Sequence, residues 1–246
     1  TESIDSDNDG VGDNSDAFPD DASKQYLSMT EAVAGLLDTN LNNCVVNQTQ
    51  ATDTVGDITA LECNHKNIES LAGIEAFTNL INLNIEGYRG SDISPIAKLT
   101  KLDQLSIAWS CCVNAARDLT PLLGLKQLIK LNLNNANIKD IAVLRGLTNL
   151  RDLQIGWNQI NDYSALANLK QLRYLNLTSS QISTIPELGA TRSLERLELR
   201  DNPITTLAGL AEMPSLRRIE LNNTQITDLS PLSGSQNLQN ISARTA

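Results

Sequence analysis

Apolar residues recur along this chain with a fixed period of 22 residues from Ile58 onward. Each copy reads approximately L-x-x-L-x-L-x-x-(N/S/T)-x-I-x-D-(I/L)-x-x-L-x-x-L-x-x. The eight full copies begin at Ile58, Leu80, Leu102, Leu128, Leu150, Leu172, Leu194 and Leu216, and a partial ninth begins at Leu238. Seven of the full copies have 22 residues, whereas the copy that begins at Leu102 has 26. A period of this length predicts a solenoid.

The first half of each copy has the spacing of a short, half-buried strand. In the copy from Leu150, the residues Leu150, Leu153 and Ile155 are expected to point inward, with Asp152 and Gln154 outward. One such strand cannot bury its leucines alone, so stacked copies should share a parallel sheet and one continuous core. The expected fold is a right-handed α/β solenoid, or horseshoe, with the sheet on its concave face.

The second half of each copy is too short for a full helix and should form the convex face. Three copies contain a hydroxyl residue followed by proline, which favours a 3₁₀ turn with the hydroxyl as its N-cap. These pairs are Ser94-Pro95, Thr120-Pro121 and Ser230-Pro231.

A helical cap is expected over residues 26–57, because an exposed solenoid end would leave apolar side chains and a strand edge in water. Ser28 and Glu31 have the spacing of a capping box, and a second short helix is expected near 41–46. The chain thus divides into an acidic segment (1–25), this cap (26–57) and the repeats (58–246).

The motif L150-x-x-L-x-I-x-x-N158-x-I160-x-D162 resembles the leucine-rich repeats of bacterial internalin-like proteins across residues 58–241. The resemblance implies that the ninth residue, asparagine in the family, bonds to turn backbones as a ladder. Asn158 and Asn202 keep it, and Ser110, Ser180 and Thr224 are partial substitutes. Lys66, Tyr88 and Ala136 depart from it, so the ladder should be interrupted in the N-terminal half.

The four cysteines allow several pairings. A disulfide from Cys44 in the cap to Cys63 in the first repeat is the main expectation, with two buried thiols as the alternative. Similar cap-to-strand cysteines are implied by the family resemblance. Cys111 and Cys112 lie in the insertion of the third repeat, where a vicinal disulfide, an intermolecular bridge and free thiols are the alternatives.

The net charge of −10 argues against a nucleic-acid partner, and no apolar run is long enough to span a membrane. The charge is concentrated at the start of the chain, because residues 1–24 contain eight carboxylates and one lysine.

This acidic segment has the spacing of a twelve-residue calcium loop, with a glycine at its sixth position. The expected ligands of Ca²⁺ are Asp5, Asp7, Asp9, the carbonyl of Val11, Asp13 and Asp16. With the residues that follow, it resembles a thrombospondin type 3 repeat, which implies an extracellular location. A second ion beside Asp20 and Asp21 is an open alternative, as is an acidic linker without order.

No catalytic constellation is apparent: the chain has one histidine and no nucleophile elbow, phosphate loop or CxxC motif. We therefore expect binding through the outward positions of the concave face, where exposed aromatic residues are typical of interaction sites. The expected binding residues are Trp109, Trp157, Tyr174, Tyr88, Asn132, Gln154 and Arg196.

The predicted function is that of a secreted or cell-surface module for adhesion to, or recognition of, a protein or glycan. The alternative is a structural subunit that assembles head to tail through its C-terminal strand edge, with calcium at the joint.

Overall fold

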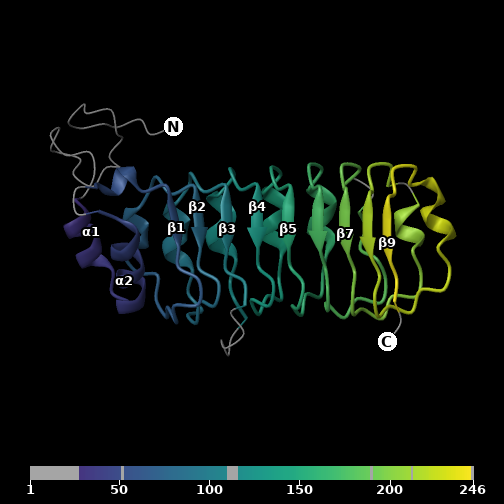
Figure 1. The fold of residues 1–246 in the computed structure, drawn as a ribbon, viewed down its shortest axis with the longest axis horizontal. Helices are drawn as coiled ribbons and strands as arrows, with labels where there is room; N and C mark the ends of the chain where they lie inside the picture. Colours follow the sequence, from purple (N-terminus) through teal and green to yellow (C-terminus); the bar gives the residue numbers. More distant parts are fainter. Residues whose placement is uncertain (1–27, 51–52, 110–115, 189–190, 212, 245–246) are drawn as a thin grey trace.

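The computed structural model of the chain describes residues 28–50, 53–109, 116–188, 191–211 and 213–244. Over these residues the chain is an elongated solenoid with a cap at its N-terminal end, and neighbouring strands follow one another along its length (Figure 1). The expected calcium ligands in residues 5–21, as well as Cys111 and Cys112, lie outside the described residues.

Within the described residues, nine parallel strands form one open sheet in sequence order, as the repeat predicts. Each strand pairs in register with the next, so that Leu131, Leu153 and Leu175 lie in one row. The strands are β1 (Ala60–Glu62), β2 (Asn82–Asn84), β3 (Gln104–Ser106), β4 (Lys130–Asn132), β5 (Asp152–Gln154), β6 (Tyr174–Asn176), β7 (Arg196–Glu198), β8 (Arg218–Glu220) and β9 (Asn240–Ser242).

The core is one continuous cluster of leucine and isoleucine side chains between the sheet and the convex turns. In the fifth coil Leu150, Leu153, Ile155, Leu166 and Leu169 are all fully buried. Burial of one such side chain contributes about 1.5–3 kcal/mol, and the repeat supplies several of them in each coil. The horseshoe fold expected from the sequence is therefore confirmed.

Short 3₁₀ helices form most of the convex face. They are η2 (Ile74–Ala76), η3 (Ser94–Lys98), η4 (Thr120–Gly124), η5 (Ala142–Gly146), η6 (Ser164–Asn168), η7 (Ala208–Leu210) and η8 (Ser230–Gly234). One more, η1 (Val55–Asp57), lies in the cap segment before β1. Proline lies in the first turn of η3, η4 and η8, as expected.

The expected N-cap role of the hydroxyl residues is wrong. In η4 the carboxylate of Asp118 accepts hydrogen bonds from the backbone N–H of Thr120 (2.9 Å) and from its hydroxyl group (2.7 Å). Asp228 caps Ser230 of η8 in the same way. The acceptor is thus the aspartate of the repeat, because a carboxylate is a stronger acceptor than a hydroxyl group.

The cap consists of helices α1 (Met29–Gly35) and α2 (Thr39–Gln48). Ser28 and Glu31 form the capping box that the sequence predicts, and Asp38 is the N-cap of α2. The same Asp38 carboxylate also accepts hydrogen bonds from Glu69 N (2.8 Å) and Ser70 N (3.1 Å) in the first coil. One side chain therefore starts a helix and ties the cap to the solenoid.

The cap also occupies the free edge of β1. The Gln48 amide accepts a hydrogen bond from Glu62 N (2.9 Å) and donates one to Glu62 O (3.2 Å), as a neighbouring strand would. The disulfide Cys44–Cys63 joins α2 to the residue that follows β1, which confirms the main expectation for this pair. Together these contacts prevent the first strand from acting as an open edge.

Candidate functional site on the concave face

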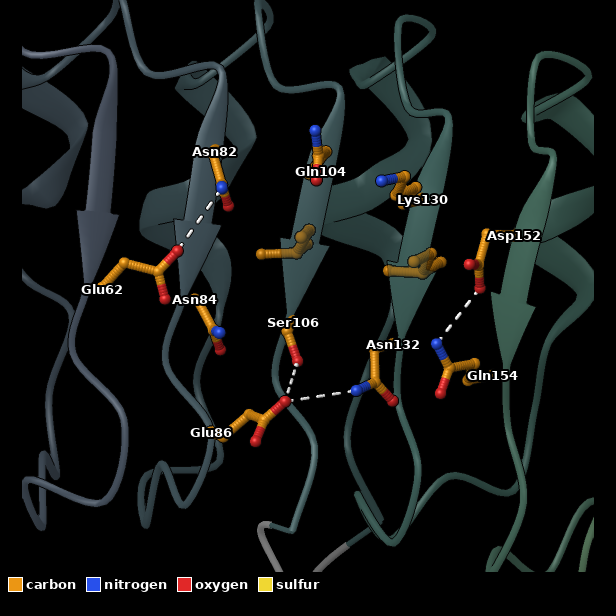
Figure 2. Close-up of a pocket in the computed structure, with 12 residues that line it drawn as sticks. Glu62, Asn82, Asn84, Glu86, Gln104, Ser106, Lys130, Asn132, Asp152 and Gln154 are labelled. Atoms are coloured by element: carbon orange, nitrogen blue, oxygen red, sulfur yellow. Dashed lines mark hydrogen bonds between the residues drawn. The ribbon is translucent and has the colours of Figure 1, made fainter.

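A polar pocket of about 230 Å³ lies on the concave face over strands β1 to β5 (Figure 2). Its lining is dominated by carboxamide and carboxylate side chains, all but one of them on the outward positions of the strands. The polar lining residues are Glu62, Asn82, Asn84, Glu86, Gln104, Ser106, Lys130, Asn132, Asp152 and Gln154. Asn132 and Gln154, two of the expected binding residues, both line this pocket.

Glu86 is the residue that links these strands, and sequence reasoning missed it because it follows β2 rather than lying in the strand. Its Oε1 accepts a hydrogen bond from Ser106 Oγ (2.9 Å) in the third coil and one from Asn132 Nδ2 (3.3 Å) in the fourth (Figure 2). The corresponding residue of the third coil is Ala108, whose short side chain leaves room for this reach. In the sequence, glutamate at the seventh position of the second repeat is followed by alanine at the seventh position of the third, and this pair was the available signal for the contact.

The charges of the pocket are unequal, with Glu62, Glu86 and Asp152 against Lys130. Partial burial raises the pKa of Asp152, although the hydrogen bond from Gln154 Nε2 (3.1 Å) and the charge of Lys130 oppose this shift. Such a surface offers many hydrogen-bond donors and acceptors but little apolar area, so it suits a polar ligand.

Trp109 and Trp157 form an exposed aromatic pair beside the C-terminal ends of β3 and β5. Their ring centroids are 5.4 Å apart, at an interplanar angle of 42°, so the two indoles meet across the intervening fourth coil. The side chains remain accessible, because Trp109 is 43% and Trp157 is 38% exposed. The structure thus joins two residues that are 48 positions apart in the sequence.

Both tryptophans have left-handed backbone conformations, with φ of 58° at Trp109 and 56° at Trp157. Such a φ costs a non-glycine residue roughly 1–2 kcal/mol. The six full coils without tryptophan at this position place small or polar residues and a histidine there: His65, Gly87, Asn135, Ser179, Asp201 and Asn223. All eight full coils have a left-handed backbone at this position, so the conformation belongs to the repeat. Tryptophan is the largest side chain that occupies it.

Tyr174 and Arg196 lie in an ionic cluster over β6 to β8. The Arg196 guanidinium stacks on the Tyr174 ring, 4.8 Å from its centroid, and pairs with Glu198. The Arg196 guanidinium also lies 3.9 Å from the carboxylate of Glu220, which pairs with the Arg218 guanidinium at 2.7 Å. Burial raises the pKa of Tyr174, as does the neighbouring Glu198. The two arginines and the two glutamates of this cluster therefore compensate one another's charges.

Tyr88 does not belong to the binding face, contrary to the expectation from the sequence. The residue is only 1% exposed, because its ring fills the place of the ninth-position asparagine and its Oη donates a hydrogen bond to Asp92 O (2.6 Å). Arg117 covers the ring, with its guanidinium carbon 5.1 Å from the centroid. Burial raises the pKa of Tyr88 to about 12.

The described residues contain no cluster of three or more metal-ligating side chains of the His, Cys, Asp or Glu type. Within the same part of the chain, no helix is long and apolar enough to cross a membrane.

Comparisons with known proteins agree with this architecture. The family profile described as "Leucine Rich repeats (2 copies)" matches residues 192–242. An internalin C2 from Listeria monocytogenes is 28% identical, with a TM-score of 0.78 over 88% of this chain and 96% of that one. An internalin of the same organism, inlF, is 25% identical, with a TM-score of 0.55 over 89% of this chain and 78% of that one. No curated protein matches the chain. The chain is a leucine-rich-repeat solenoid with an internalin-like fold.

Proposed function

We propose that this protein is a secreted or cell-surface recognition module that holds a protein or glycan ligand on its concave face. The observation that carries the proposal is the exposed Trp109–Trp157 pair. Tryptophan dominates the energetics of many protein interfaces because it brings a large, rigid apolar surface. The internalin-like fold supports an interaction scaffold and favours this role over a head-to-tail assembly.

A protein ligand fits the aromatic pair as an anchor, with the polar pocket as the surrounding contact surface. A glycan ligand is favoured by a separate observation: amide and carboxylate side chains lie in the concave pocket, on the strands that the tryptophans follow. Indole faces pack against the C–H faces of sugars, and planar amides and carboxylates bind pairs of hydroxyl groups. The two ligand classes thus use the same residues in different ways.

The test presents the labelled full chain to arrays of immobilised oligosaccharides and of extracellular protein domains. Exchange of both tryptophans for alanine (Trp109→Ala, Trp157→Ala) should lower the affinity for the captured ligand by about thirtyfold, equivalent to about 2 kcal/mol at a hot spot. Leu123→Ala is the matched control, because Leu123 is 53% exposed on the convex turn η4. Unchanged affinity in the tryptophan variant, or equal losses in both variants, would contradict a concave site.

We also propose that Asp5, Asp7, Asp9, Asp13 and Asp16, with the carbonyl of Val11, bind Ca²⁺. Hard carboxylate and carbonyl oxygens in this spacing are the donors that calcium prefers, and extracellular sites of this kind have dissociation constants of roughly 10⁻⁴–10⁻³ M. Titration calorimetry of the full chain should detect binding that Asp5→Asn with Asp9→Asn removes. Glu187→Gln with Asp140→Asn is the control for lost charge, and absence of heat in the natural chain would contradict the site.

A further inference from the structure

Several coils carry a basic residue within two positions of their first leucine, shortly before the strand begins. The strands begin at the upper edge of the sheet in Figure 1. Two of these residues, Arg151 and Arg173, are aligned by the backbone. Arg151 N donates a hydrogen bond to Ile129 O (2.8 Å), and Arg173 N donates one to Arg151 O (2.8 Å). Neighbouring coils therefore place their side chains about 4.8 Å apart, the spacing of strands in a sheet.

Four exposed residues form what we call the basic rim: Lys126, Arg151, Lys170 and Arg173. Arg173 has a carboxylate within reach, Glu195 at 3.7 Å. Lys126 donates to a backbone carbonyl, Gly146 O, at 3.2 Å. Among the described residues, Lys126, Arg151 and Lys170 have no ion-pair partner.

This arrangement is unfavourable for the isolated chain. Like charges in adjacent positions of a sheet repel one another and destabilise the pairing. The seventh coil has a carboxylate at the same repeat position. Glu195 lies between Arg173 (3.7 Å) and Arg217 (4.0 Å) and offsets the repulsion between these two arginines. No carboxylate interrupts the row between Arg151 and Arg173, although the protein has a net charge of −10. Lys126, Arg151 and Lys170 thus keep positive charges without an ion-pair partner among the described residues, and such charges on an acidic protein attract an anionic partner.

We propose that the basic rim binds an acidic polysaccharide that runs along the solenoid axis, with its anionic groups on successive coils. A linear ligand fits because the rim residues lie in the third, fifth and sixth copies of the repeat, spread along the solenoid axis. Exposed Gln127 and Gln171 follow Lys126 and Lys170 directly and offer amide groups to sugar hydroxyls.

The test uses the full chain and immobilised heparin as the probe, measured by surface plasmon resonance at several salt concentrations. Arg151→Gln with Arg173→Gln should weaken heparin binding about tenfold. The salt dependence of the affinity should show that about two fewer counterions are released from heparin on binding. The matched control is Lys98→Gln with Lys139→Gln, which removes the same charge from exposed positions outside the rim.

Equal weakening in the control variant would overturn the proposal, since total charge would then explain the effect. Equal binding of polyglutamate and heparin would also overturn it, because the rim would not distinguish a polysaccharide. If the natural chain self-associates and the rim variant does not, the rim binds the acidic residues 1–24 of a second copy, and the polysaccharide proposal is overturned. The Trp109→Ala, Trp157→Ala variant should retain heparin binding, which separates this site from the concave one.

Discussion

Asn158 is a buried residue whose side chain satisfies five backbone groups in two adjacent coils. Its Oδ1 accepts hydrogen bonds from Ala136 N (3.1 Å) and Ile138 N (2.9 Å). Its Nδ2 donates to Leu133 O (2.8 Å), Ile155 O (3.0 Å) and Gly156 O (3.0 Å). The ladder that the family resemblance implies is therefore present here, because no other short side chain carries both an acceptor and two donors.

Asn158→Ala should lower the free energy of unfolding by roughly 2–4 kcal/mol, because it leaves several buried backbone groups without a partner. Chemical denaturation followed by circular dichroism measures the change. The control is Asn161→Ala on the exposed surface of the same coil, which should stay within about 0.5 kcal/mol of the natural protein. Similar stabilities for the two variants would contradict the role of the buried amide.

Helix α2 is the element whose attachment depends most clearly on one ionised group. Partial burial raises the pKa of Asp38, but backbone N–H donors of Glu69, Leu41, Ser70 and Asn40 outweigh it and hold the pKa below its usual value of 3.8. A group with a depressed pKa stabilises the fold above the pKa of the unfolded chain. That stability is lost as the pH falls through the folded-state pKa.

The cap should consequently loosen below about pH 4. Asp38→Asn should destabilise the protein by about 1 kcal/mol at pH 7, because an amide offers one acceptor oxygen where the carboxylate offers two. Its unfolding midpoint should also depend less on pH between about 2 and 5 than that of the natural chain. Glu187→Gln is the control, an exposed carboxylate in the sixth coil; an unchanged pH profile in Asp38→Asn would refute the assignment.

The sequence predicted those elements whose characteristic residues lie close together in the chain. The capping box of α1 and the prolines of the 3₁₀ turns depend on residues within one turn of each other, so spacing reveals them. The contacts of Asp38 with Glu69 and of Gln48 with Glu62 join residues 31 and 14 positions apart. Spacing gives no hint of such pairs, because they arise only when the cap packs on the first coil.

At the scale of the whole molecule, stability is distributed along one axis, since each coil contacts mainly its two neighbours. Leu153 and Ile241 occupy the same position of the repeat, in a central coil and in the last one. Leu153 is fully buried, whereas Ile241 is 42% exposed on the terminal strand β9. A substitution at the same repeat position should therefore change the free energy of unfolding by different amounts in different coils.

Leu153→Ala should cost roughly 2–5 kcal/mol, because it leaves a cavity between two packed coils. Ile241→Ala should cost less than about 1 kcal/mol, since much of the isoleucine surface is already in water. Hydrogen exchange of the strand amides, together with denaturant unfolding, gives both values. Equal losses at the two sites would show that the solenoid unfolds without regard to position along its axis.

The sequence by itself determined the solenoid, its parallel sheet and the inward leucines, because a fixed period dictates which side chains every coil buries. Only the tertiary structure decided that Tyr88 is buried, that Glu86 reaches across two coils and that Trp109 and Trp157 meet. The stacking of coils also aligned Arg151 with Arg173. These contacts depend on distances between coils, and a repeat specifies those distances only after its copies have packed.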